Sequence, residues 1–171
     1  MLTDVFSLLI RPQYYDFDPS SIVHNATYVR WLEDGRIAFQ QASPWPTEAL
    51  YAADMAAVLT RTEIRYKRPV RLSETVLLRV WVLSVGRSAL SLALRFVHPE
   101  DGTEYARAEQ SGCFVRRSTG KPIAMPAEFL EFCRQYQARF CVPEEGKGGG
   151  KKKTFVFTRA CVTQAQTPSY T

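Results

Sequence analysis

The chain has 171 residues, of which 46% are hydrophobic and 23% are charged, a composition that excludes a fully disordered protein and fits one domain with a tail. No stretch approaches the roughly 18 consecutive apolar residues that a membrane-spanning helix needs. The first residues carry Asp4 where a secretory signal would carry positive charge, so we expect a cytoplasmic protein with no membrane contact.

The net charge of +5 has a local origin. Four lysines, Lys147 and Lys151 to Lys153, lie in the segment GKGGGKKK, and removing these four charges from +5 leaves +1. Because this run is the only feature that favours nucleic acid, we expect no nucleic-acid partner. The four cysteines form no CxxC pair and only two histidines are present, so we also expect reduced thiols and no metal site.

The first part of the chain predicts one strand and one long helix. Residues 8–17 read as a strand that Pro12 confines to a sheet edge or a strand start. Over residues 22–41, apolar side chains recur at three- and four-residue steps, which predicts a helix with one buried face. Gly35 costs this helix about 1 kcal/mol relative to alanine, so we expect its backbone to pack closely against a sheet. A short helix is expected over residues 47–53.

The second part predicts a sheet. Strand-like patterns cover residues 59–66, 75–85, 89–98 and 104–115, which predicts four strands in a meander. In the third of these, every second residue is large and apolar, so one of its faces is expected to be buried. A second helix is expected over residues 127–136.

The end of the chain differs in composition from the rest. We expect one compact domain over residues 1–140, followed by a lysine- and glycine-rich linker and tail over residues 141–171. Residues 154–162 have a strand-like pattern, and the sequence leaves open whether they add a strand to the domain.

One segment is similar to a known family. The run YDFDPSSIVHNATY at residues 15–28, followed by RWLE at residues 30–33, resembles the 4-hydroxybenzoyl-CoA thioesterase family and its acyl-CoA and acyl-carrier-protein thioesterase relatives. The resemblance extends over about residues 6–136. It implies an α+β hotdog fold, in which a curved, five-stranded antiparallel sheet wraps around one long central helix, with a further C-terminal helix. The chain departs from the family at Ser21, where a glycine is expected, which suggests a differently shaped turn.

The resemblance implies hydrolysis of an acyl-CoA or acyl-carrier-protein thioester to a carboxylic acid and a thiol. This reaction needs a base or nucleophile at the carbonyl carbon and positive potential at the developing oxyanion. Asp18 matches the second aspartate of the family and is the candidate for the first role, by direct attack or by activating water. The backbone N–H of Asn25 is the candidate for the second role. The simpler interpretation of Asp18 is an N-cap of the helix.

Other candidate residues have ordinary structural interpretations beside the functional one. His24 and Glu33 are further catalytic candidates, although His24 suits a hydrogen bond in the first helical turn and Glu33 suits a salt bridge. Asp16 is expected to make local hydrogen bonds. Substrate binding, by phosphate contacts or by lining an acyl pocket, is the candidate role of four residues: Tyr15, Arg87, Ser88 and Arg116.

The resemblance also implies partners. We expect no cofactor, because CoA or phosphopantetheine arrives as part of the substrate. Family members generally pair into dimers or tetramers with sites between subunits, which implies a homo-oligomer. Two alternatives stay open: another hotdog enzyme, such as a hydratase or dehydratase, and a non-catalytic protein that binds acyl thioesters or a carrier protein. The acyl group, and the choice between CoA and a carrier protein, are not determined by the sequence.

Overall fold

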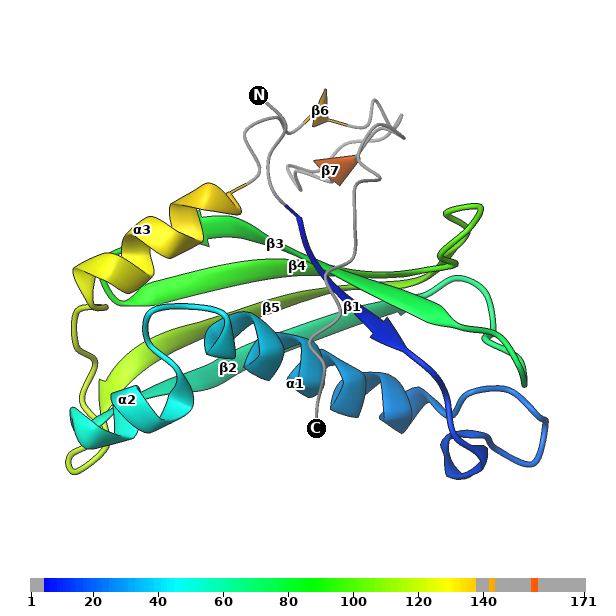
Figure 1. The fold of residues 1–171 in the computed structure, drawn as a ribbon, viewed down its shortest axis with the longest axis horizontal. Helices are drawn as coiled ribbons and strands as arrows, with labels where there is room; N and C mark the ends of the chain where they lie inside the picture. The colour runs from blue at the N-terminus through cyan, green and yellow to red at the C-terminus, as the bar shows by residue number, and fades with distance from the viewer. Residues whose placement is uncertain (1–4, 138–141, 144–154, 157–171) are drawn as a thin grey trace, which may run out of the picture.

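The computed structural model describes residues 5–137, 142–143 and 155–156. A five-stranded antiparallel sheet curves around the long helix α1 (Asn25–Gln41), which confirms the expected α+β hotdog architecture (Figure 1). The strands of this sheet are β1 (Phe6–Ile10), β2 (Met55–Tyr66), β3 (Val76–Val85), β4 (Ala89–Val97) and β5 (Glu104–Arg116). The shorter helices are the 3-10 helix η1 (Tyr14–Asp16), α2 (Thr47–Ala52) and α3 (Ala127–Gln135).

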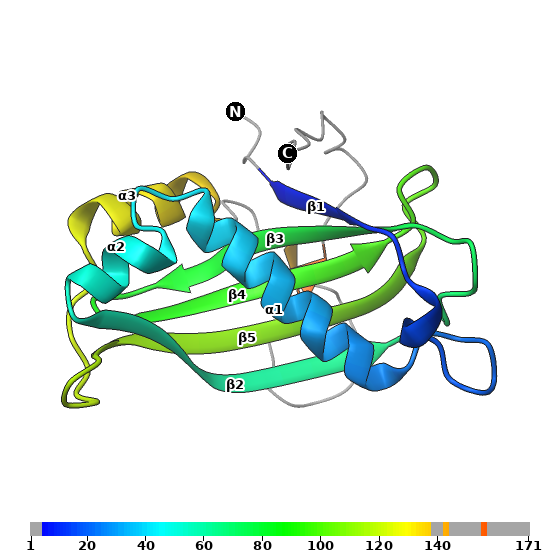
Figure 2. The same cartoon turned by 60° about the horizontal axis from the view of Figure 1, so that its bottom comes forward.

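The order of the strands differs from a simple meander. The order across the sheet is β1-β3-β4-β5-β2, as Figure 2 shows, so β3, β4 and β5 form the expected meander but β2 pairs with β5. The expectation of four strands paired in chain order is therefore wrong. The connection over residues 67–75 crosses the end of the sheet beside the start of α1, where the buried Val70 accepts a hydrogen bond from the Val23 N–H at 3.0 Å.

The segment before α1 also differs from the prediction. The strand ends at Ile10, because Pro12 interrupts it and residues 14–16 turn into η1. The helix begins at Asn25, three residues later than expected, since Ile22 and Val23 are extended and form β-bridges with Arg71 and Phe17. His24 is the N-cap of α1, so the N-cap interpretation of Asp18 is wrong.

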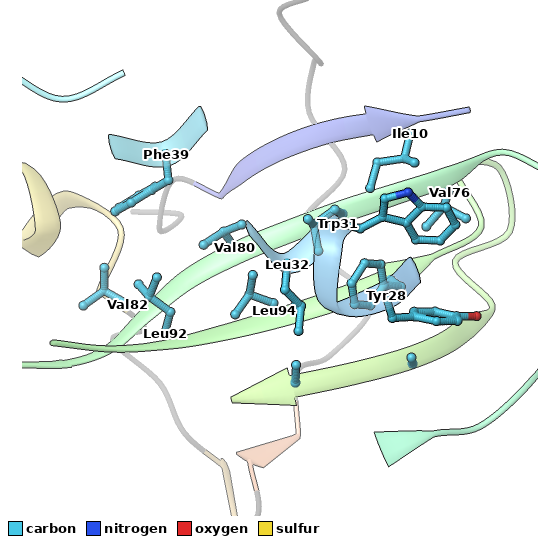
Figure 3. Close-up of a cluster of buried hydrophobic side chains, with 14 of the residues drawn as sticks. Ile10, Tyr28, Trp31, Leu32, Phe39, Val76, Val80, Val82, Leu92 and Leu94 are labelled. Atoms are coloured by element: carbon cyan, nitrogen blue, oxygen red, sulfur yellow. The ribbon is translucent and has the colours of Figure 1, made fainter. Parts of the chain in front are cut away.

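The core lies between α1 and the sheet. The buried face of the helix contributes Tyr28, Trp31, Leu32 and Phe39, which face valines and leucines of β3 and β4 (Figure 3). Gly35 is the point of closest approach: a Cβ atom at this position would lie 2.4 Å from Leu78 Cδ2, closer than real Cβ contacts allow. This confirms the expected close packing of the Gly35 backbone on the sheet.

The two edges of the sheet are unlike. β1 is short and packs beside α1, whereas β2 has 12 residues and is exposed continuously over residues 57–62. This stretch includes the apolar Val58 and Leu59, which are 38% and 41% exposed. An exposed edge strand presents unpaired backbone groups that can pair with another chain.

The C-terminal region is described only in part. β6 (Val142–Pro143) and β7 (Phe155–Val156) pair as a two-stranded antiparallel ladder. The rest of the expected linker and tail, including most of residues 154–162, lies outside the described residues, so the domain boundary at residue 140 stays a prediction. Within the part that is described, no helix is long and apolar enough to cross a membrane.

Candidate active site

Asp18 lies in a tight turn between η1 and α1. Its Oδ1 accepts the Ser20 N–H at 2.8 Å and the Ile22 N–H at 3.4 Å, while its own N–H donates to the Ile22 carbonyl at 2.9 Å. The carboxylate is thereby fixed through one oxygen. The other oxygen, Oδ2, makes no hydrogen bond to any residue that the structure describes, and the side chain is only partly buried. Asp18 therefore presents one oxygen that is available for chemistry.

Ser21 gives the Asp18 turn its shape. Its φ of 61° lies in the left-handed region, which glycine occupies without a steric penalty and other residues occupy at a cost. The serine thus adopts the backbone conformation that favours the glycine of the family. Whether this departure changes the turn relative to the family stays a prediction.

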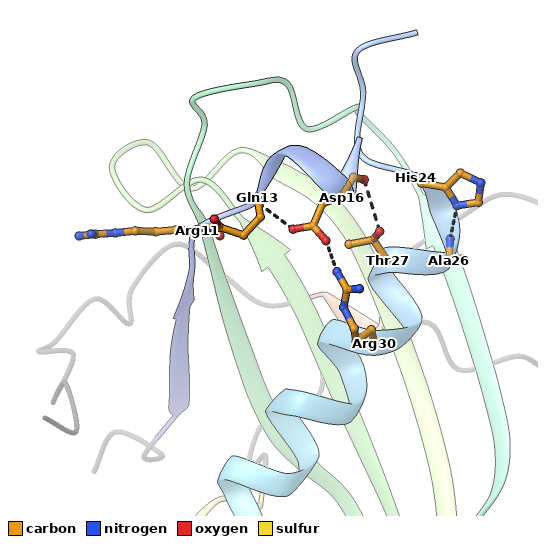
Figure 4. A network of polar contacts seen from close by, with 7 residues as sticks. All are labelled: Arg11, Gln13, Asp16, His24, Ala26, Thr27 and Arg30. Carbon is orange, nitrogen blue, oxygen red and sulfur yellow. Dashed lines mark hydrogen bonds and ion pairs between the residues drawn. The ribbon is translucent and has the colours of Figure 1, made fainter. Parts of the chain in front are cut away.

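Asp16 holds the turn against the helix (Figure 4). It is 2% exposed; its Oδ2 accepts the Gln13 N–H at 2.7 Å, and its Oδ1 forms an ion pair with Arg30 of α1. Its carbonyl accepts the His24 N–H at 2.8 Å and the Thr27 hydroxyl at 3.3 Å. Asp16 therefore makes the local hydrogen bonds that the sequence analysis expected, and both of its carboxylate oxygens are engaged.

The start of α1 supplies the second element of the site. His24 Nδ1 accepts the Ala26 N–H at 3.0 Å, so this nitrogen is occupied by capping and is not available as a base. The neighbouring N–H of Asn25 has no hydrogen-bond acceptor within the described residues, and Asn25 is exposed. Unpaired N–H groups at a helix start carry partial positive charge and favour a developing anion.

Tyr66 joins the edge strand to this helix start. Its hydroxyl donates to the Asn25 carbonyl at 3.2 Å, and partial burial raises the pKa of Tyr66, so the hydroxyl stays protonated at neutral pH. The contact fixes the end of β2 beside the first turn of α1. Sequence reasoning did not identify Tyr66, which has no motif of its own.

Seven of the eight predicted site residues fall into two separate groups, and the eighth, Glu33, lies in the middle of α1. Tyr15, Asp18, His24 and Asn25 lie at the end of the sheet where Ile10 pairs with Val76. The other group lies beyond the far ends of the strands: Arg87, Ser88 and Arg116. Because ten strand residues span about 30 Å, one subunit does not bring the two groups together.

Several of these candidates have structural partners. Ser88 accepts the Phe114 N–H through its carbonyl at 2.8 Å, and Arg116 Nη1 lies 3.7 Å from Asp54 Oδ2. Glu33 forms an ion pair with Arg36, as the simpler interpretation expected. The Tyr15 side chain is 76% exposed, so it does not line an enclosed pocket in this chain. Its ring contacts the Arg30 guanidinium, whose central carbon lies 5.5 Å from the ring centre.

A pocket that the sequence analysis missed lies between the second half of α1 and strands β2, β4 and β5. It offers about 40 Å³ to the centres of water-sized molecules. Its wall is mainly apolar but includes three long polar side chains: Arg36, Gln40 and Gln110. The available signal was the alternation along β5, where Gln110 follows Ala106 and Ala108 at an inward position.

No group of three or more His, Cys, Asp or Glu side chains within the described ranges is arranged to hold a metal ion.

Comparisons with known proteins show the family to which the chain belongs. Residues 12–133 match the sequence model of a family described as the thioesterase-like superfamily. The acyl-CoA thioester hydrolase YbgC of Escherichia coli O6:H1 is 27% identical over 135 residues, which cover 79% of this chain and 100% of YbgC.

Two solved structures share the fold. A Staphylococcus aureus protein in complex with CoA superposes with a TM-score of 0.77 at 17% identity, covering 84% of this chain and 92% of the other. The 1,4-dihydroxy-2-naphthoyl-CoA thioesterase Slr0204 of Synechocystis gives a TM-score of 0.71 at 12% identity, covering 77% and 96%. With the family match over most of the folded region, these findings lead to one conclusion: the chain belongs to the thioesterase-like superfamily and has its hotdog fold.

Proposed function

We propose that the protein hydrolyses acyl-CoA thioesters, with Asp18 as base or nucleophile and the start of α1 as the oxyanion site. One observation carries this proposal: the segment that matches the family holds a partly buried carboxylate oxygen and a helix-start N–H that both lack a partner within the described residues. The names of the relatives, among them an acyl-CoA thioester hydrolase, support the same reaction.

The chemistry needs only these groups and water. The thioester carbonyl oxygen accepts the Asn25 N–H, which stabilises the oxyanion that forms on attack. In the base route, Asp18 removes a proton from water as the water oxygen bonds to the carbonyl carbon; the carbon–sulfur bond then breaks, and the proton held by Asp18 passes to the leaving thiolate. In the nucleophilic route, an Asp18 oxygen bonds to the carbonyl carbon, the carbon–sulfur bond breaks, and the thiolate takes a proton from solvent. Water then hydrolyses the anhydride, which releases the acyl group as a carboxylate, returns a proton to solvent and regenerates Asp18. No resident cofactor is required.

We further propose a two-fold dimer that pairs the β2 edges. The exposed stretch of β2 supports it, because an apolar edge strand of this length favours pairing. Tyr66 at one end of β2 contacts Asn25, while Val58 and Leu59 near the other end line the pocket beside Arg36. Antiparallel pairing would therefore bring the start of α1 in one subunit close to the pocket of its partner. The same pairing would bring it toward the end of the partner's sheet at which β5 ends with Arg116. Such a dimer would unite the two separated groups of site residues.

The test is thiol release from a panel of aliphatic and aromatic acyl-CoAs by the wild type and by Asp18→Asn. Loss of the base or nucleophile is expected to lower kcat by about 10²- to 10⁴-fold, with folding and molecular mass unchanged. Asp101→Asn is the matched control, since Asp101 Oδ1 accepts the Thr103 N–H at 2.8 Å in a turn like that of Asp18. This control is expected to keep the wild-type rate.

Other outcomes would redirect the proposal. Equal rates in the wild type and Asp18→Asn would remove Asp18 from the reaction. Release only from an acyl carrier protein would change the carrier, and binding of acyl-CoA without any turnover would indicate the non-catalytic alternative.

A further inference from the structure

The outer face of the sheet, on the side away from α1, carries a buried apolar patch. Trp81 of β3 and Ala93 of β4 are cross-strand partners that are 6% and 7% exposed, and Val97, farther along β4, is 5% exposed. Side chains alternate between the two faces of a strand, and the neighbours of Trp81, Val80 and Val82, belong to the inner core. The three residues Trp81, Ala93 and Val97, the outer patch, are not part of that core and are buried on the opposite face.

The helices of the described part of the chain pack on the inner face. The buried apolar side chains of α1, α2 and α3 all belong to the inner core. A sheet with large apolar residues on both faces needs a layer on each side, because these side chains are otherwise left in water. The burial of the outer patch therefore calls for a further cover.

The chain beyond α3 begins beside the outer patch. The Tyr136 carbonyl accepts the Val82 N–H at 3.0 Å, and Gln137 forms a parallel β-bridge with Val82, the residue after Trp81. From this edge of β3, residues 138–171, the C-terminal extension, still follow. The extension thus starts within reach of the outer face.

The described part of the extension lies on that side of the sheet. In both overall views, β6 and β7 are on the side away from α1 (Figures 1 and 2). β7 begins the apolar run FVF at residues 155–157. We propose that this run packs over the outer patch, so that the extension adds a third layer to the helix and the sheet. The family match ends at residue 133, so the third layer is an addition to the matched region.

Charge argues against a second copy of the chain as the cover. Arg79, Arg95 and Arg107 are cross-strand neighbours in one row on the same face. Glu104 forms ion pairs with Arg95 and Arg107 at 2.7 and 3.2 Å, so these four residues keep an excess of positive charge. A second copy laid on this face by a two-fold axis would bring its own row toward this one, and like charges oppose such an association. A tethered segment also meets the patch at an effective concentration of about millimolar.

Acrylamide quenching of tryptophan fluorescence tests the cover in the full-length chain. The Trp45→Phe variant is the parent, since its remaining tryptophans are Trp31, which is buried in the inner core, and Trp81. Adding Phe155→Asp and Val156→Asp is expected to raise the quenching constant roughly twofold or more, because the charged run no longer packs on an apolar surface. A further Trp81→Phe change is expected to abolish this increase.

The matched control is the pair Gln164→Asp and Gln166→Asp, which adds the same two charges to the extension outside the apolar run. It is expected to leave the quenching constant of the parent unchanged. Circular dichroism and cooperative urea unfolding identify the folded variants. An unchanged quenching constant in folded protein with Phe155→Asp and Val156→Asp would overturn the proposal. A parent constant that rises on dilution would overturn it as well, since the protection would then come from a second copy.

Photo-cross-linking tests the same contact without a charge in the run. Photo-reactive benzoylphenylalanine replaces Phe155, and a mixture of isotopically labelled and unlabelled chains is illuminated and analysed by mass spectrometry. Cross-links from position 155 to peptides of β3 and β4 in the same chain are the expected result. Cross-links only to other parts of the chain, or only between labelled and unlabelled chains, would overturn the proposal.

Discussion

Two buried polar side chains, one beside each half of α1, differ in whether their hydrogen bonds are satisfied. At the start of the helix, Asp16 is almost fully buried, yet both of its carboxylate oxygens have partners from the backbone and from Arg30. Beside the second half, Gln110 is equally buried, but its carbonyl oxygen has no partner in the described part of the chain. A buried polar group with partners stabilises the fold, whereas one without a partner in the chain is left for water or another molecule from outside the chain to pair with. The difference teaches that burial alone does not identify a functional residue.

The largest expected effect comes from breaking the proposed dimer, which would separate the two groups of site residues. Leu59→Glu introduces a charge near the middle of the exposed edge strand, and in a two-fold dimer the change occurs twice at the interface. We expect the mass measured by light scattering to fall from a multiple of 19.5 kDa to that of one chain, and thiol release to fall at least 100-fold. Thr119→Glu, on an exposed turn, should change neither quantity. A fully active monomer would show that each subunit contains a complete site.

The close packing of α1 on the sheet is tested at Gly35, which lies against Leu78 of β3. Gly35→Ala is expected to lower the free energy of unfolding by about 1–2 kcal/mol, because the clash with Leu78 outweighs the better helix propensity of alanine. Urea unfolding of Gly35→Ala, of Leu78→Val and of the double variant measures the coupling. The double variant should be more stable than the sum of the single changes predicts. Simple additivity would mean that the two side chains do not meet.

Glu104 extends the comparison to a third polar group, a partly buried carboxylate. Desolvation by itself raises the pKa of Glu104, but a hydrogen bond from Lys67 and the charges of Arg95, Lys67 and Arg107 outweigh it, and the net pKa lies below the ordinary value of 4.5. Its stabilising contribution is therefore present above about pH 4.5 and lost as the pH falls through the lowered pKa. Glu104→Gln should cost about 1–2 kcal/mol at pH 7 and much less at pH 3.

The control for Glu104 is Glu100→Gln, at an exposed position nearby. It should change the free energy of unfolding little at either pH. A cost of Glu104→Gln that is the same at pH 3 and pH 7 would contradict the lowered pKa.

The smallest expected effect concerns the Asp18 turn. Ser21→Gly removes the cost of a left-handed serine but adds freedom to the unfolded chain, so we expect a gain of about 0.5 kcal/mol with unchanged turnover. Ser21→Val should lose about 1 kcal/mol or more, because a branched side chain fits this backbone region poorly. Thermal unfolding compares the three proteins. A valine variant as stable as the wild type would rule out the left-handed conformation.

The sequence predicted elements that depend on local periodicity and missed what depends on pairing across the chain. The strands β3 to β5, the helix α3 and the close approach of Gly35 all follow from side-chain spacing. The position of β2 beside β5 does not, because long-range pairing leaves no local pattern. The predicted helix includes Ile22 and Val23, yet these residues form bridges to other segments and the helix begins only at Asn25.

The candidate site was predictable to a similar degree. Asp18 and Asn25 came from a family motif, which specifies residues that are close in the chain. Arg87 and Arg116 were grouped with them by charge alone, and the fold separates them by the length of the sheet. Gln110 stands out only once its hydrogen bonds are known, because an inward polar residue on a strand can equally be a satisfied one.

The central claim is that, of two aspartates in one short segment, Asp16 stabilises the fold and Asp18 performs chemistry. Measuring kcat on a substrate of the wild type together with the free energy of unfolding, for Asp16→Asn and Asp18→Asn side by side, tests it most directly. We predict that Asp16→Asn loses about 2 kcal/mol of stability but keeps kcat within tenfold, whereas Asp18→Asn loses at least 100-fold in kcat and less than about 1 kcal/mol. Wild-type turnover in Asp18→Asn, or a larger loss of kcat in Asp16→Asn than in Asp18→Asn, would contradict the assignment.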